Sequence, residues 1–185
     1  MAQPWDRYVE ERLAEDLARW LPEAYRPDVE APRPVDEFLA ALPADAARAL
    51  ARWDELARAG AIPDTFLFEE GGMYGFDFTA NDVEVHDGGA DVSARLWMLG
   101  HDGGGNGYCG LPSGEVGIWN HEINAVERHN RFPSLDCFAW ALVRVSAVEA
   151  GTLNRDSPEV ADLVDSPADG CRFLVSQLGA WLDDR

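Results

Sequence analysis

Apolar residues recur every three or four positions over residues 5–21, and this period predicts an amphipathic helix with one buried face. A proline-rich stretch over residues 27–34 predicts an extended connection. Residues 35–42 and 43–59 are rich in alanine and predict a broken or paired helix, with Gly60 as its C-terminal cap. The first 60 residues are therefore expected to be helical.

The pattern changes at residue 62 to short aromatic or β-branched segments separated by glycine and Asn-Asp turns, which is typical of an antiparallel meander. A Pro112-Ser113-Gly114 turn predicts a hairpin, and residues 123–126 suggest a short edge strand. The other expected strands cover residues 65–68, 74–78, 83–85, 94–99, 107–111 and 115–119.

Helical spacing returns after Ser134, which we interpret as the N-cap of a helix ending near Gly151. Ser157-Pro158 and Ser166-Pro167 are two further helix starts. The order of helices, strands and helices predicts a single α+β domain. It would have N-terminal helices, a central mainly antiparallel sheet of about five or six strands, and C-terminal helices packed on the sheet. Five tryptophans on helical stripes are expected in the core: Trp5, Trp20, Trp53, Trp140 and Trp181.

The composition is strongly acidic, with 34 Asp and Glu against 15 basic residues, a net charge of −19 and no lysine. This balance disfavours binding to nucleic acid, and the missing lysines exclude Schiff-base chemistry and a phosphate-loop lysine. No apolar run reaches the length of about 18 residues that a membrane span needs, and the first residues are acidic, so we expect a cytoplasmic protein.

The most distinctive segment is the glycine-rich stretch of residues 99–109. A phosphate-binding loop is disfavoured because a strand follows the glycines instead of a helix, and a calcium loop lacks the alternating oxygen ligands. We interpret the segment as a tight turn in which glycines supply positive φ angles and polar side chains bond the backbone. The turn residues are Asp102, Gly103, Gly104, Gly105 and Asn106.

His121, Glu122 and His129 invite a metal-site interpretation, but the spacing does not place the two histidines one helical turn apart, and exposed loop residues are the favoured alternative. Cys109 could be a nucleophile activated by a histidine across the hairpin, although a buried structural cysteine is the simpler interpretation. The other two cysteines, Cys137 and Cys171, are interpreted as small buried apolar groups. We expect no cofactor and no metal.

Residues 99–106, then Gly114-Glu115-Val116 and Trp119-Asn120-His121-Glu122, then a helix that begins at Ser134 with Phe138, resemble the SUKH superfamily. That family has a glycine-rich turn, a hairpin whose second strand ends in "WDHE" or similar, and a closing helix. The similarity covers about residues 96–145, with Asn120 in place of the usual Asp, and a looser similarity to the family's "LPxxY" at residues 21–25. It implies a SUKH-like α+β domain over residues 1–151, with helices in 5–59, a sheet in 62–126 and a helix in 134–150. Residues 152–185 would be a helical extension packed on the same domain.

The resemblance also implies a function, because many bacterial SUKH members look like immunity proteins that bind and neutralise a cognate toxin, often a nuclease or a deaminase. Residues 61–91 contain eight acidic residues and no arginine, a distribution that would steer a basic partner. The expected partner-binding residues are Glu69, Glu70, Asp82, Glu84, Asp87, Asp91, Asp102, Asn106, Trp119, His121 and Glu122. The expected structural turn residues are Gly103, Gly104, Gly105 and Gly114.

Two alternatives stay open from the sequence. One is a regulatory scaffold of the same fold without a toxin partner, in which the surplus acid serves solubility alone. The other is a hydrolase or metalloenzyme that uses His101, Asp102, His121 and Glu122.

Overall fold

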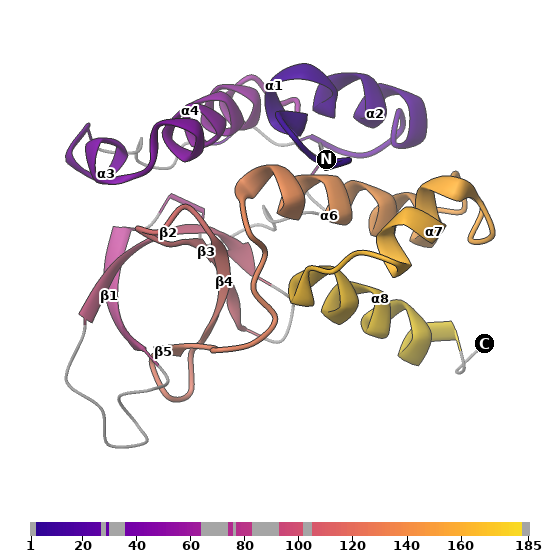
Figure 1. The fold of residues 1–185 in the computed structure, drawn as a ribbon. Helices are drawn as coiled ribbons and strands as arrows, with labels where there is room; N and C mark the ends of the chain where they lie inside the picture. Colours follow the sequence, from indigo (N-terminus) through magenta and orange to yellow (C-terminus); the bar gives the residue numbers. More distant parts are fainter. Residues whose placement is uncertain are drawn as a thin grey trace.

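The computed structural model describes residues 3–26, 29, 36–63, 74–75, 77–82, 93–101 and 105–182. The N-terminal helices form a layer over one central helix, with the sheet on one side of that helix and the last two helices on the other (Figure 1). This arrangement confirms the predicted single α+β domain, with helices before and after the strands.

Four short helices make up the N-terminal layer. They are α1 (Tyr8–Glu11), α2 (Leu13–Trp20), α3 (Asp36–Ala41) and α4 (Ala44–Arg58), and Gly60, with φ of 62°, closes α4 as predicted. The expectation of one continuous helix over residues 5–21 is wrong. The chain breaks at Arg12, with φ of −132°, where its side chain donates to the Pro4 carbonyl and α1 is tied to a distant helix by Val9.

The sheet contains β1 (Asp77–Asp82), β2 (Ser93–His101), β3 (Gly107–Gly110), β4 (Val116–Asn120) and β5 (Ala125–Val126). Consecutive strands pair antiparallel, and β5 also pairs in parallel with β1, so the sheet closes on itself. The short strand expected at 123–126 is therefore β5, but it is not an edge strand. The expected strand at 74–78 begins later, at Asp77, because Tyr74 and Gly75 form a turn. The strands expected at 65–68 and 83–85 lie outside the described residues.

The central helix is α6 (Leu135–Glu149), which begins as predicted with the Ser134 hydroxyl accepting a hydrogen bond from the Cys137 amide. Apolar residues surround nearly its whole circumference, and the helix is buried on most sides, as such a sequence requires. It packs against α1, α2 and α4 on one side and against the last two helices on another. Phe138 reaches the sheet, where its ring lies 5.1 Å from that of Tyr108.

The last two helices are α7 (Pro158–Val164), capped by Ser157, and α8 (Asp169–Leu182). They pack on α6 and on each other (Figure 1). The C-terminal helices were expected to pack on the sheet. Of these helices, α6 contacts the sheet through Phe138, whereas α7 and α8 pack on α6. Ser166 stands in the turn before α8, accepting a hydrogen bond from the Ala168 amide, so α8 begins three residues later than its start signal.

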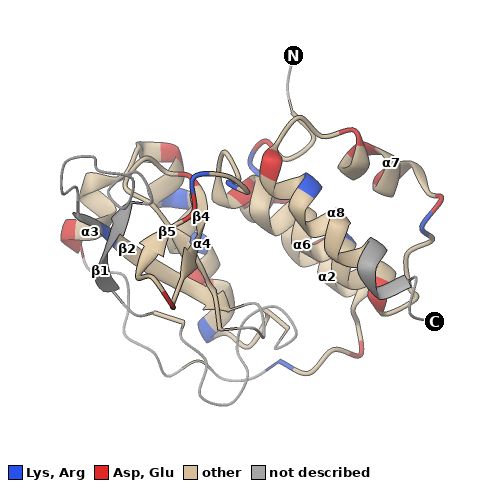
Figure 2. Cartoon of the chain, turned by 90° about the horizontal axis from the view of Figure 1, so that it is seen from below, with Lys and Arg blue, Asp and Glu red and all other residues tan. Residues whose placement is uncertain are grey.

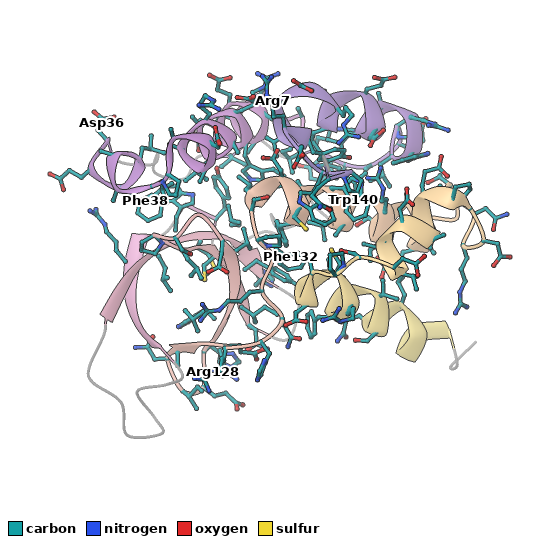
Figure 3. The ribbon with its side chains drawn as sticks, viewed as in Figure 1. Arg7, Asp36, Phe38, Arg128, Phe132 and Trp140 are labelled. Carbon is teal, nitrogen blue, oxygen red and sulfur yellow. The ribbon has the colours of Figure 1, made fainter. Side chains whose placement is uncertain are left out.

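The main core lies between the N-terminal layer, α6 and the outer face of the sheet, and a small second core fills the sheet with Leu96, Cys109, Leu111 and Val126. Phe38 projects from α3 toward the sheet, with its ring 6.1 Å from Trp97, and Trp140 projects from α6 toward the N-terminal helices (Figure 3). The predicted core tryptophans are buried at positions 5, 20, 53 and 140, while the side chain of Trp181 lies outside the described part. Within the ranges given above, none of the helices is long and apolar enough to cross a bilayer.

Candidate functional site

Two turns meet at one end of the sheet, the β2–β3 turn and the β4–β5 turn. Gly105 in the first turn has φ of +93°, and a Cβ atom there would lie 3.0 Å from Cε1 and 3.2 Å from Nδ1 of His121 in the second turn. Glycine is therefore needed at this position both for its backbone angle and for the space that the imidazole occupies. The glycine-rich turn and the Trp-Asn-His-Glu segment, separate in the sequence, form one surface.

Trp119 lies at the end of β4 and is half-buried. Its backbone pairs with Gly107, where a Cβ would lie 3.3 Å from the indole Cε3, and its Nε1 donates a hydrogen bond of 3.0 Å to Asn124 Oδ1. The indole is thus fixed in one orientation while part of its surface stays open to solvent.

The β4–β5 turn presents three exposed side chains in a row, His121, Glu122 and Ile123. The Asn120 Oδ1 atom accepts a hydrogen bond of 3.0 Å from the Glu122 amide, which is a local bond that an Asp carboxylate would also make. Ile123 is 45% exposed, so an apolar side chain stands beside the carboxylate. The turn therefore offers charged, polar and apolar contact groups together.

Asp82 belongs to the same end of the sheet by strand register. Asp82 pairs with Val126, Val126 with Trp119, and Trp119 with Gly107, so Asp82 lies two strands from Trp119, about 10 Å away at the usual strand spacing. Of the predicted partner-binding residues, this region unites Asp82, Asn106, Trp119, His121 and Glu122. The remaining ones lie outside the described residues: Glu69, Glu70, Glu84, Asp87, Asp91 and Asp102, as do Gly103 and Gly104 of the turn.

Gly114 occupies the opposite end of the β3–β4 hairpin and is separate from this surface. Its φ is +89°, and a Cβ there would lie 2.9 Å from the Ala46 Cβ and 3.4 Å from the Pro43 Cγ. Gly114 lies in the hairpin turn, as predicted, and it also lets this turn pack closely against the start of α4, which the sequence analysis did not predict.

The described residues that were considered for catalysis are divided between the interior and the surface of the protein. Cys109 is fully buried, its Sγ lies 3.6 Å from the Gly117 carbonyl oxygen, and burial raises the pKa of its thiol to about 12. His121, Glu122 and His129 are exposed, and the described residues contain no group of three potential metal-ligating side chains close enough to hold an ion.

A concave feature that the sequence did not reveal lies where the β3–β4 turn meets the starts of α4 and α6. The pocket has a volume of about 160 Å³ and includes Asp45, Ser113, Ser134 and Asp136 in its lining. Burial raises the pKa of Asp136, and the neighbouring carboxylates add to the shift, while its Oδ1 accepts a hydrogen bond of 2.7 Å from the Val9 amide. Because the two aspartates are 91 positions apart in the chain, no local motif could have paired them.

Many of the arginines are committed to carboxylates of the same molecule. Arg58 binds Asp54 at 2.8 Å within the fold, and comparable ion pairs on the surface join Arg7 to Glu10, Arg19 to Glu159, Arg52 to Glu55, Arg95 to Glu37 and Arg131 to Glu115. Acidic residues lie on α3 and α7, among other places (Figure 2), and Asp36 on α3 and Asp162 on α7 are not among these pairs. Among the residues whose burial the structure describes, Asp54 is the one buried carboxylate, so the acidic side chains there lie largely at the surface.

Family models, curated proteins and solved structures give no significant match to this chain. Its function has to be inferred from its own residues. The feature that they bring together is a polar and aromatic surface at one end of a sheet, on a protein with a large excess of negative charge.

Proposed function

We propose that this protein is an immunity-type binding protein that neutralises a cognate basic toxin, such as a nuclease, through the surface formed by Asn106, Trp119, His121 and Glu122. The observation that carries the proposal is the position of Trp119, which packs against the second core, is held by Asn124, keeps part of its surface exposed, and precedes the exposed His121 and Glu122 in the same turn. The resemblance of the same residues to the SUKH motif also supports it.

The chemistry of this surface suits a protein partner. Tryptophan is enriched among the residues that dominate binding energy, and an indole already fixed by hydrogen bonding loses little freedom when a partner covers it. Ile123 extends the apolar contact, and His121 and Glu122 form a polar rim beside it. A partner would therefore seat an apolar or cationic group on Trp119 and a basic side chain on Glu122.

The charge of the molecule suits a basic partner. A net charge of −19 attracts a cationic protein over distances of about 10 Å, which raises its association rate. Asp82 lies two strands from Trp119, and three more acidic residues, Glu84, Asp87 and Asp91, come two, five and nine positions later in the sequence. A nuclease binds the phosphates of its substrate with basic residues. An acidic protein of this kind would therefore compete with the nucleic acid for those basic residues.

The test is to co-express the protein with the toxin domain encoded by a neighbouring gene, and to measure cell survival and the dissociation constant of the purified complex. Glu122→Arg should weaken binding about tenfold, and Trp119→Ala about 30-fold or more. Glu23→Arg, an exposed charge reversal in the loop after α2, is the matched control and should change the affinity much less. Raising the salt concentration should weaken the wild-type complex.

Each variant is first checked for an unchanged unfolding midpoint, so that a loss of binding reports the surface and not the fold. The proposal fails if the wild-type protein neither binds the toxin nor protects the cells. Binding that is unaffected by Trp119→Ala and Glu122→Arg, but lost on Glu23→Arg, would keep the immunity role and refute this location.

A further inference from the structure

Two cysteines that are 34 positions apart meet between the central helix and the last helix. Cys137 in α6 and Cys171 in α8 are both fully buried, and their Sγ atoms lie 3.6 Å apart. Both are free thiols. Their burial confirms the sequence-based interpretation of small core groups, and the structure adds that they lie in contact with each other.

Burial disfavours a thiolate at either cysteine, while several groups around the pair stabilise one. Each cysteine is the third residue of its helix, counting from Leu135 and from Asp169, so both lie where the partial positive charge of a helix N-terminus stabilises an anion. A hydrogen bond between the two sulfurs lowers the pKa of Cys171; burial opposes this shift, and the nearby Ser166 hydroxyl and Arg172 charge add to it. The same hydrogen bond and burial raise the pKa of Cys137. We therefore assign the role of nucleophile to Cys171.

We propose that Cys137 and Cys171 form a reversible disulfide that joins α6 to α8 when the protein meets a hydroperoxide. The Cys171 thiolate attacks the peroxide, the O–O bond breaks, and a sulfenic acid forms with release of water after proton uptake. The Cys137 sulfur then attacks that sulfenic sulfur, the S–O bond breaks, and a second water leaves. In total, two thiols and one hydrogen peroxide give one disulfide and two waters.

The two sulfurs are already in van der Waals contact. A disulfide is about 2.05 Å long, so the sulfurs, which lie 3.6 Å apart, have to approach by about 1.5 Å. The start of α8 is already seated close to α6. The Gly170 amide donates to the Arg131 carbonyl at 3.0 Å, and a Cβ on Gly170 would lie 2.6 Å from the Phe132 ring. The disulfide would therefore lock an existing contact.

The experiment uses the full chain and hydrogen peroxide, with Cys109→Ser as the background because Cys109 is the third thiol and lies in the sheet. After oxidation, denaturation and alkylation, both remaining thiols should be lost, and a disulfide reductant should restore them. Arg144 and Arg155 lie between the two cysteines, so trypsin separates them into residues 132–144 and 156–172, and mass spectrometry should find these two peptides joined. The oxidised protein should also unfold at a higher temperature than the reduced one.

Two variants test the order of the steps. On the Cys109→Ser background, Cys137→Ser should stop at a sulfenic acid on Cys171 that dimedone traps, while Cys171→Ser should react much more slowly. The proposal is overturned if peroxide leaves peptides 132–144 and 156–172 unlinked, or if the bonds that form join separate molecules. It is also overturned if the unfolding temperature of the linked protein does not rise. None of these readouts depends on toxin binding, so they are independent of the proposed function.

Discussion

Replacing Arg144 with methionine should be among the most damaging single changes to the stability of this protein. The guanidinium lies on α6 with its side chain only 7% exposed, and its carbon stands 4.6 Å from the Trp140 ring centre, 5.1 Å from that of Trp20 and 5.6 Å from that of Tyr8. Its Nη1 donates to the Trp140 carbonyl at 3.0 Å, and its Nη2 lies 3.6 Å from Asp16 Oδ2. Through these contacts the Arg144 side chain links α6 to α1 and α2.

The magnitude follows from these contacts. Removing one partner of a buried ion pair costs about 3–5 kcal/mol, and loss of desolvated cation–π contacts belongs to that cost. Two features reduce it. The Asp16 side chain is 16% exposed and keeps a hydrogen bond of 2.8 Å from the Tyr8 hydroxyl, and the buried Arg144 Nε has no hydrogen-bond partner among the described residues. We therefore expect Arg144→Met to lower the free energy of unfolding by about 2–4 kcal/mol.

Urea unfolding followed by tryptophan fluorescence and circular dichroism measures this loss. The matched control is Arg172→Met, because Arg172 is 56% exposed and its Asp169 partner is exposed as well, so it should cost less than about 1 kcal/mol. Asp16→Asn combined with Arg144→Met should cost less than the sum of the single changes, since the two side chains interact. Equal losses for Arg144→Met and Arg172→Met would refute the reasoning.

Three further changes test other parts of the fold. Gly114→Ala should lower the free energy of unfolding in urea more than Gly151→Ala does. Both glycines have positive φ, but only at Gly114 does an atom, the Ala46 Cβ, lie 2.9 Å from the added carbon. Equal losses would exclude a role for this close approach. Burial raises the pKa of Tyr74, whose hydroxyl donates to Asp54 at 2.8 Å, so the unfolded state loses this proton first and stability should fall above about pH 10. Tyr74→Phe should flatten that fall in a pH series of unfolding curves, and an unchanged slope would contradict the assignment. Ser134→Ala should remove about 1 kcal/mol through loss of the α6 cap, and a cost near zero would contradict that role.

The parts of the fold that could be predicted are those set by local sequence. The caps at Ser134 and Ser157 and the hairpin turn at Gly114 each depend on residues within a few positions of one another, and all three were confirmed. The break at Arg12 interrupts a regular period of apolar residues, and the bond by which Asp136, distant in the chain, accepts from the Val9 amide at the start of α1 could not be predicted either. The spacing of apolar residues indicates which face of a helix is buried, but not which distant residues contact the end of that helix.

The candidate site could also be predicted in part, where it depends on residues that are close together in the sequence. Trp119, His121 and Glu122 are close in sequence, so their shared location could be expected, and the glycine-rich turn was recognised by composition. That Gly105 touches the His121 ring depends on the strand register, which places the β2–β3 and β4–β5 turns at one end. The approach of Cys137 to Cys171 and the pocket beside Asp136 arise from packing of helices, for which the sequence held no signal.

The closure of the sheet by β5 and β1 limits how this protein can associate with others. Each of the five described strands has a hydrogen-bonded neighbour on both sides, although β5 pairs with β1 only at Asn81 and Asp82 and with β4 only at Trp119 and Asn120. The closure shortens the rows of backbone amides and carbonyls that a sixth strand could pair with, and so limits strand addition and edge-to-edge polymerisation. Side chains on the turns offer a partner another mode of contact, and such contacts can change by single substitutions without disturbing the pairing of the sheet.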